Sequence, residues 1–132
     1  NAFSFFAHIP NNIYKIEYVI CVYENVYKKY QKQLGHFYRF IYNIIKIIDN
    51  NKILDDEEKE KYINLIQAQL SNDILGLLFY NALSPMGKDK NGQDKFRQYL
   101  DNYGLLENID PDSIIQFEDL KHYPKTKFKI NL

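Results

Sequence analysis

The amino-acid sequence predicts an all-α fold: a single-domain helical bundle with a long first helix and about five helices in total. Three observations carry this prediction. Apolar residues recur at intervals of three and four, the spacing of one helix face, over most of the chain. Residues that favour helix ends, such as Ser71 and Gly104, stand between these stretches. Only the tail, KTKFKINL, alternates as a strand would, and we expect it to be irregular or briefly extended.

The first helix is predicted over residues 13–48. Gly35 interrupts its pattern, so we expect a kink near that residue, and Asp49-Asn50-Asn51 ends the helix. The apolar positions on its buried side are Ile13, Ile16, Val19, Ile20, Tyr23, Val26, Tyr27, Tyr30, Phe37, Phe40, Ile41, Ile44, Ile45 and Ile48.

Two further helices are predicted between residues 55 and 83. The acidic run DDEE at 55–58 favours a helix start, because negative charge stabilises the N-terminal end of a helix. Ser71 is expected to cap a separate helix over Asn72 to Leu83, and Pro85 ends it. That helix is apolar almost all round, which is typical of a helix in the middle of a domain. The buried side of the earlier helix consists of Tyr62, Ile63, Leu65, Ile66 and Leu70.

The last third of the chain begins with a polar loop, MGKDKNGQ, at 86–93. Helical spacing returns over Asp94 to Tyr103, and Gly104 stands at the expected C-terminal cap. Asp110-Pro111 predicts the start of a short amphipathic helix that ends before Pro124.

Length and composition limit the classes of function. A chain of 132 residues, 45% hydrophobic and 26% charged, is long enough for one domain with its own core. Its formal net charge is zero, so there is no specific signal for nucleic acid, although a local basic patch is compatible with this balance. No apolar run approaches the roughly 20 residues that a membrane span needs.

The single cysteine and the start of the chain bear on its cellular location. Cys21 excludes an internal disulfide and is expected to be a buried core thiol. Together with the lack of a secretion signal, it favours a cytoplasmic domain. The chain starts at Asn1 rather than Met, and we expect residues 1–12 to be a leader or a linker from an upstream segment. Any membrane contact is then expected to come from segments outside this chain.

No sequence motif indicates a cofactor or a metal site. The phosphate-binding patterns G-x-x-x-x-G-K-[ST] and G-x-G-x-x-G do not occur. One cysteine and three scattered histidines, His8, His36 and His122, do not form a structural zinc pattern. We therefore predict neither a cofactor nor a bound metal, and no catalytic residue can be assigned.

One polar stripe interrupts a strongly apolar helix. His36, Arg39, Asn43 and Lys46 follow one another at offsets of three, four and three, so they share a helix face, and Tyr42 flanks them. Three interpretations remain open: a solvent-facing stripe, hydrogen bonds that fix helix packing, or a ligand-binding or catalytic cluster.

A second polar set lies in the segment INLIQAQLSNDILGLLFYNALS. Gln67 and Ser71 share a helix face with Asn64, while Gln69 and Asn81 interrupt apolar surroundings. An unpaired buried amide costs about 1–3 kcal/mol, so these side chains need partners. Because a guanidinium only donates hydrogen bonds, we expect an acidic partner for Arg39, or a site open to water or an anionic ligand.

Four segments carry a resemblance to a known family: 35–46 (GHFYRFIYNIIK), 68–84 (AQLSNDILGLLFYNALS), 95–109 (KFRQYLDNYGLLENI) and 122–128 (HYPKTKF). From about residue 30 to the C-terminus, the chain resembles the bacterial phage abortive infection proteins with an AbiC-like domain. The matching polar residues are His36, Arg39, Tyr42, Lys46, Gln69, Ser71, Tyr80 and Asn81.

Two positions depart from the family pattern. Gln67 stands where the family has Arg, which removes a charge from the cluster if that Arg belongs to it. Ile74 stands where the family has Glu, so only the Ser71 half of a capping box remains. The resemblance implies a role in anti-phage defence, with the domain in the cytoplasm and membrane segments ahead of it in many members. It implies no particular reaction.

Three hypotheses follow for the function. The first is a cytoplasmic sensor or interaction domain of a defence protein, which binds a phage or host protein. The second is a nuclease-like effector that uses His36, Arg39 and Tyr42, because His titrates near neutrality and Arg stabilises phosphoryl charge. The third is a helical scaffold that forms a homo-oligomer through an aromatic stripe of Tyr23, Tyr27 and Tyr30.

Overall fold

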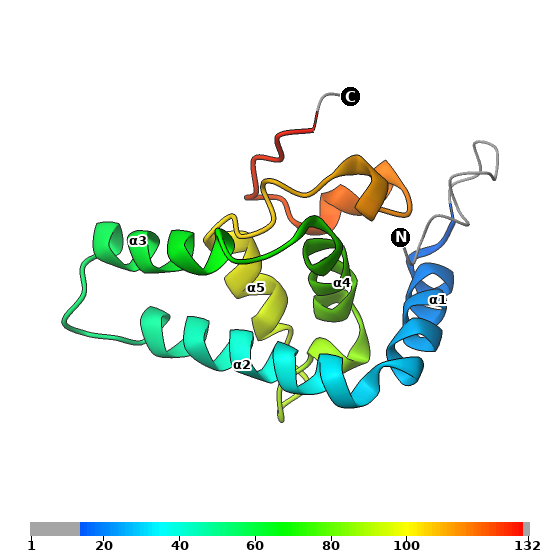
Figure 1. The fold of residues 1–132 in the computed structure, drawn as a ribbon, viewed down its shortest axis with the longest axis horizontal. Coiled ribbons are helices and arrows are strands. Elements are labelled where there is room, and N and C mark those ends of the chain that lie inside the picture. Colours follow the sequence, from blue (N-terminus) through cyan, green and yellow to red (C-terminus); the bar gives the residue numbers. More distant parts are fainter. Residues whose placement is uncertain (1–13, 131–132) are drawn as a thin grey trace.

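The computed structural model describes residues 14–130, which form five α-helices and three short 3-10 segments (Figure 1). This part of the chain contains no β-strand, so the predicted all-α class and the expected number of helices are confirmed. The predicted leader or linker at 1–12 lies outside the described residues. The elements in chain order are α1 (Ile16–Lys29), α2 (Gln31–Asp49), α3 (Asp56–Gln67), α4 (Asn72–Leu83), η2 (Pro85–Gly87), α5 (Lys95–Asn102), η3 (Pro111–Ser113) and η4 (Phe117–His122).

The predicted long first helix is two helices, α1 and α2, that run in different directions (Figure 1). The break is at Tyr30 and not at Gly35. Tyr30 leaves the helical region with φ −118° and ψ 22°, and its N–H donates to the carbonyl of Tyr27 in a tightened last turn. The apolar spacing continues on both sides of the break, so periodicity alone could not reveal it. Gly35 lies inside α2, where an added Cβ would stand 3.2 Å from the Tyr27 hydroxyl.

The helices α3 and α4 begin at the positions that the sequence predicts. Asp55 caps α3: its carboxylate accepts from the Glu58 N–H at 2.8 Å, and the Glu58 side chain accepts from the Asp55 N–H. Ser71 caps α4 by accepting from the Ile74 N–H at 3.3 Å. The range Asn72–Leu83 for α4 is the predicted one. The α3 helix runs back alongside α2, as Figure 1 shows.

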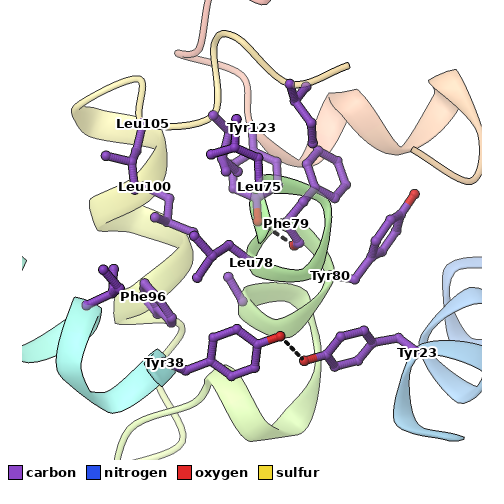
Figure 2. Close-up of a cluster of buried hydrophobic side chains, with 14 of the residues drawn as sticks. Tyr23, Tyr38, Leu75, Leu78, Phe79, Tyr80, Phe96, Leu100, Leu105 and Tyr123 are labelled. Carbon is purple, nitrogen blue, oxygen red and sulfur yellow. Dashed lines mark hydrogen bonds between the residues drawn. The ribbon is translucent and has the colours of Figure 1, made fainter. Parts of the chain in front are cut away.

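The core is built around α4, which contacts α1, α5, η2 and η3. Figure 2 shows Leu75, Leu78 and Phe79 of α4 between side chains from the surrounding elements. The Tyr123 hydroxyl donates to the Phe79 carbonyl at 2.6 Å, which attaches the C-terminal segment to this helix. The prediction that this apolar helix lies in the middle of the domain is therefore confirmed.

The short helix predicted after Asp110 is two 3-10 segments, η3 and η4, instead. Asp110 caps the first of them, as expected, through a bond from the Asp112 N–H. The N–H of Ile115 donates to the buried Tyr80 hydroxyl at 2.8 Å, so it is not available for an α-helical bond. A tertiary contact therefore interrupts the predicted helix. Gly104 has φ +61° after α5, in agreement with the predicted cap, and residues 123–130 are irregular.

Cys21 is exposed, so the prediction of a buried thiol is wrong. The buried face of α1 consists of Val19, Ile20 and Tyr23, and Cys21 points away from it. Cys21 stands between the apolar residues Ile20 and Val22, so the sequence around it does not show which face of α1 is buried. None of the helices in the described part of the chain is both long and apolar enough to cross a membrane.

Candidate functional site

The predicted polar stripe lies along the solvent side of α2. His36, Arg39, Asn43 and Lys46 are all exposed, while Tyr38, Ile41 and Ile45 make up the middle of the opposite, buried face. Amphipathicity accounts for this placement, because an α2 rotated by half a turn would bury four polar side chains. Whether the exposed stripe binds a ligand remains a prediction.

Arg39 has a histidine as its hydrogen-bonding partner. The Nη2 atom of Arg39 donates to Nδ1 of His36 at 3.0 Å. Since a guanidinium cannot accept, Nδ1 is the acceptor and the ring proton lies on Nε2 when this bond forms. No carboxylate forms an ion pair with Arg39 among the residues of 14–130. Of the two expected environments, the structure therefore has the open one, in which water or an anionic ligand can reach the guanidinium.

Arg39 also borders a pocket between α2, α4, α5 and the segment that follows α4. The pocket has a volume of about 150 Å³. It brings together three of the predicted residues: Arg39 and Tyr42, one turn apart on α2, and Asn81, which is distant in the sequence. The full lining is Tyr38, Arg39, Tyr42, Asn81, Met86, Gly87, Lys88, Asp89 and Phe96, and we call this site the α2 pocket.

A hydrogen-bonded chain runs from the α2 pocket into the core. Asn81, which is 2% exposed, donates its side-chain amide to the Tyr23 hydroxyl at 3.0 Å. Tyr23 in turn donates to the Tyr38 hydroxyl at 3.1 Å, and Figure 2 shows these two rings meeting end to end. The buried side-chain amide of Asn81 thus has a hydrogen-bond partner, as the sequence predicted.

The tyrosines around the α2 pocket are protonated at neutral pH. Burial raises the pKa of Tyr23 to about 12, although its hydrogen bonds with Tyr38 and Asn81 partly oppose this. Burial also raises the pKa of Tyr38, and burial together with the charge of Asp89 raises that of Tyr42. These hydroxyls can therefore donate or accept hydrogen bonds, but they are unsuited to act as bases near pH 7.

The wall of the α2 pocket opposite α2 depends on a glycine. An added Cβ at Gly87 would lie 2.5 Å from the Asn81 carbonyl oxygen and 2.7 Å from the Ala82 Cα. Only a residue without a Cβ can therefore approach α4 so closely. The loop beyond it is ordered by Asp89, whose Oδ1 accepts from the N–H groups of Asn91 and Gln93 at 2.8 and 2.9 Å.

The other predicted polar residues lie away from the α2 pocket. Gln67 donates to the carbonyl of Leu105 at 3.0 Å and joins α3 to the turn after α5. Ser71 is a helix cap, and Gln69 is exposed between α3 and α4. Asn43 and Lys46 are exposed on α2 but do not line the pocket. Because Gln67 is not a lining residue, its departure from the family pattern removes no charge from this pocket.

A second concave surface follows the turn from α1 into α2. This basic hollow has a volume of about 600 Å³ and is lined by Tyr27, Lys28, Lys29, Gln31, Lys32, Gln33, His36 and Arg39. The sequence interpretation did not predict it, although the lysines of the segment YKKYQK were a visible signal. It also missed Lys88, Asp89 and Phe96 in the α2 pocket, because an ordinary polar loop and an amphipathic helix supply them.

No group of three or more His, Cys, Asp and Glu side chains within residues 14–130 is arranged as metal ligands would be. The buried carboxylates are bonded within the protein. Asp119 accepts from the Tyr80 hydroxyl at 2.8 Å and from the Gln116 amide at 2.9 Å. These contacts organise the C-terminal segment rather than an open site.

Comparison with known proteins identifies the family of this chain. The family model described as "Putative phage abortive infection protein" matches residues 29–114, which include α2 to α5 and every residue of the α2 pocket. Neither the curated proteins nor the solved structures give a match. The matched segment is well over half of the chain, and it includes three of the four segments on which the resemblance was based. The chain belongs to the putative phage abortive infection protein family.

Proposed function

We propose that this chain is a cytoplasmic interaction domain of an abortive infection protein and that the α2 pocket receives a side chain of a phage or host protein. The family supplies the process, anti-phage defence. The single observation that carries the proposed activity is the junction of Arg39, Tyr42 and Asn81 with the 86–89 segment in one small pocket.

The size of the α2 pocket favours a side chain over a nucleotide or a cofactor. Pockets for drug-sized ligands usually have volumes of about 300–1,000 Å³. The α2 pocket, at about 150 Å³, is well below that range. A protruding side chain of a partner protein would fill it, and the exposed stripe of α2 beside it would provide the surrounding contact surface.

The chemistry of the α2 pocket favours an acidic side chain. Arg39 and Lys88 contribute two positive charges, and Asp89 contributes one negative charge. The Asp89 carboxylate already accepts two backbone hydrogen bonds, whereas the guanidinium of Arg39 has only a histidine partner. A carboxylate of the partner could accept two parallel bonds from Arg39, which is the strongest arrangement that an arginine offers.

Phage plaquing on cells that express the intact gene tests this proposal. Arg39→Ala should abolish protection, and Arg39→Lys should restore little of it because a lysine cannot form the paired bonds. Lys46→Ala is the matched control: it removes a charge from the same exposed stripe outside the α2 pocket, and it should leave protection intact.

Thermal melting of the purified variants separates binding from folding. Arg39 is exposed and, within residues 14–130, is bonded only to His36, so Arg39→Ala should change stability by less than about 1 kcal/mol. Undiminished protection by Arg39→Ala would refute the proposal. A melt lowered by many degrees would instead make Arg39 a packing residue.

A nuclease-like effector is the second candidate, because the His36–Arg39 contact borders the basic hollow. The contact itself is less favourable for a general base, since Arg39 occupies Nδ1 and Nε2 carries the proton. Purified protein should be incubated with tRNA, mRNA and DNA, with and without divalent metal. Cleavage by the natural protein that is lost in His36→Ala would support the nuclease hypothesis. Substrates that stay intact would refute it and favour the interaction domain.

Part of the aromatic stripe that the scaffold hypothesis uses as an interface is not on the surface. Tyr23 is fully buried in the core of its own chain, and Tyr27 stacks on Tyr38 with ring centroids 6.4 Å apart. Of the three tyrosines proposed to contact a partner, Tyr30 alone is exposed. An interface through this aromatic stripe would therefore require the core to open.

A further inference from the structure

The two signs of charge gather at opposite ends of α2, although the net charge of the chain is zero. The basic hollow lies at the N-terminal end of α2, and the acidic start of α3 follows its C-terminal end. Figure 1 shows the turn from α1 into α2 and the start of α3 toward opposite ends of the longest axis. Beyond Arg39, the last residue that lines the hollow, α2 continues to Asp49, a further rise of about 15 Å at 1.5 Å per residue.

The basic hollow has positive charge without local compensation. Lys28, Lys29, Lys32 and Arg39 line it together with His36, and no acidic residue does. The ion pairs found within residues 14–130 include none of these four cations. Lys29 is exposed, and its Nζ lies over the ring of Tyr30 at 5.6 Å from the ring centroid.

The acidic end is the complementary surface, and we define it as Asp55, Asp56, Glu57, Glu58 and Glu60, all of them exposed. None of these carboxylates takes part in an ion pair in the described part of the chain. The neighbouring Lys59 donates instead to the carbonyl of Asp49 at 2.8 Å. The first turn of α3 therefore presents a projecting negative charge, while the basic hollow is concave and positive.

We propose that the acidic end of one copy of this chain docks into the basic hollow of the next copy. Each contact is head-to-tail, so a joined pair still has one free basic hollow and one free acidic end. Such contacts close into a ring or continue as an open chain. This proposal does not rest on the proposed function: the basic hollow and the α2 pocket share Arg39 alone among their lining residues, and the three lysines of the hollow lie outside the pocket.

A second copy fits the charge pattern better than a nucleic acid does. A chain of zero net charge has no long-range attraction for a polyanion. A nucleic acid would engage the basic hollow alone, whereas self-association uses both surfaces. Because both surfaces are exposed and charged, their attraction is expected to weaken strongly with salt.

Sedimentation velocity of the full chain provides the first test. At low ionic strength the average mass should rise with protein concentration. At about 1 M salt, where the screening length is about 3 Å, the protein should sediment as a monomer at every concentration. A monomer under both conditions, or assemblies that persist in high salt, would overturn the proposal.

Two sets of neutralising substitutions give a sharper test. Lys28→Gln/Lys29→Gln/Lys32→Gln removes three of the four Lys and Arg charges of the basic hollow and leaves Arg39, and Asp56→Asn/Glu57→Gln/Glu60→Gln removes three of the five charges of the acidic end. Each variant alone should be monomeric. An equal mixture should form heterodimers and nothing larger, because only one intact surface of each kind remains. A mixture that stays monomeric, or that forms longer assemblies, would contradict the head-to-tail contact.

Two controls complete the experiment. Lys90→Gln/Lys121→Gln/Lys127→Gln neutralises three exposed lysines elsewhere and should assemble as the natural protein does. A fluorescent single-stranded RNA is added to each protein as the competing probe. Self-association would be overturned if the natural protein stayed monomeric and bound the RNA, and if the variant with Lys28, Lys29 and Lys32 replaced did not bind it. The basic hollow would then be a nucleic-acid site.

Discussion

The side-chain amide of Asn81 donates a hydrogen bond to the Tyr23 hydroxyl at 3.0 Å, across 58 positions of the sequence. This bond joins α4 to α1 beneath the α2 pocket, and Tyr38 extends it to α2 at 3.1 Å. Three helices therefore meet in one buried polar contact. The contact determines where the buried floor of the α2 pocket lies.

Removing the central hydroxyl of this contact should be costly. Tyr23→Phe leaves the Asn81 amide without its acceptor in a buried site and also breaks the bond to Tyr38. We expect the free energy of unfolding to fall by about 1–3 kcal/mol, measured by urea denaturation. Tyr62→Phe, at a tyrosine that is about half exposed, is the control and should change little. Equal losses in the two variants would mean that the buried network adds no stability.

A methyl group at Gly87 should displace the wall of the α2 pocket. The added Cβ would meet backbone atoms of Asn81 and Ala82 at 2.5–2.8 Å, and backbone cannot move aside as a flexible side chain can. Gly87→Ala should therefore lower the free energy of unfolding by about 1–3 kcal/mol. Thermal or urea denaturation measures the effect.

Gly35→Ala is the matched comparison for that substitution. Its Cβ would meet only side-chain ends, the Tyr27 hydroxyl at 3.2 Å and the Arg39 guanidinium at 3.6 Å. Within a helix, replacing glycine by alanine gains up to about 1 kcal/mol, which offsets a small shift of the Tyr27 ring. If Gly35→Ala lost more free energy of unfolding than Gly87→Ala, the close backbone contacts at Gly87 would not determine the loss of stability.

Asp101 should be essential for attaching the C-terminal segment. One oxygen of this buried carboxylate accepts from the N–H groups of Lys125 and Thr126, both at 3.0 Å, and from the Thr126 hydroxyl at 2.8 Å. Asp101→Ala removes the acceptor of the Lys125 N–H and the Thr126 hydroxyl and leaves the Thr126 N–H with a longer bond, 3.3 Å, to the Tyr123 carbonyl, so we expect a loss of about 3 kcal/mol. Hydrogen exchange at the Lys125 and Thr126 amides should accelerate in the same variant.

Asn102→Ala serves as the control for Asp101. Asn102 is exposed and accepts only from the Lys125 ammonium at 2.9 Å. Its loss should change stability by no more than about 0.5 kcal/mol and should leave the exchange of both amides unchanged. Unaltered exchange in Asp101→Ala would mean that other contacts hold the segment.

The buried carboxyl of Asp119 should make stability depend on pH. Burial raises the pKa of Asp119, and the bonds from Gln116 and Tyr80 only partly oppose this. Between the unfolded value of about 3.9 and the raised folded pKa, the native protein binds more protons than the unfolded chain. The contribution of Asp119 is therefore most favourable below the unfolded pKa and declines as the pH rises through the folded pKa.

The difference between the natural protein and Asp119→Asn isolates this contribution. Urea denaturation at a series of pH values between about 4 and 7 should show the natural protein losing stability relative to the variant as the pH rises. His122 has the opposite effect, because burial lowers its pKa, but it is present in both proteins and largely cancels. A difference that grows in favour of the natural protein with pH would indicate a lowered pKa instead.

Local sequence signals predicted α4 well because they depend on neighbouring residues. Ser71 caps the helix through an N–H three positions away, and Pro85 follows its end. The turn at Tyr30 has no such signal, since apolar residues continue at helical spacing through it. The buried Tyr80 hydroxyl likewise interrupts the predicted helix after Asp110 from a distant part of the chain.

The candidate site was only partly visible in the sequence. Spacing placed His36 and Arg39 on one helix face, and composition identified Asn81 as an amide that needs a partner. Spacing could not show that Arg39 and Asn81 line the same pocket, or that Gln67 bonds elsewhere. Those outcomes depend on how α2 and α4 cross and on the close approach of Gly87 to α4.

The sequence by itself determined the all-α class, the extent and central position of α4, and membership of the abortive infection family. These follow from periodicity, capping residues and short motifs, which act over a few positions along the chain. Only the tertiary structure decided the turn between α1 and α2, the bond between Asn81 and Tyr23, and the separation of opposite charges at the two ends of the molecule. Such features arise where segments distant in sequence pack together, and a local pattern carries no record of its distant partner.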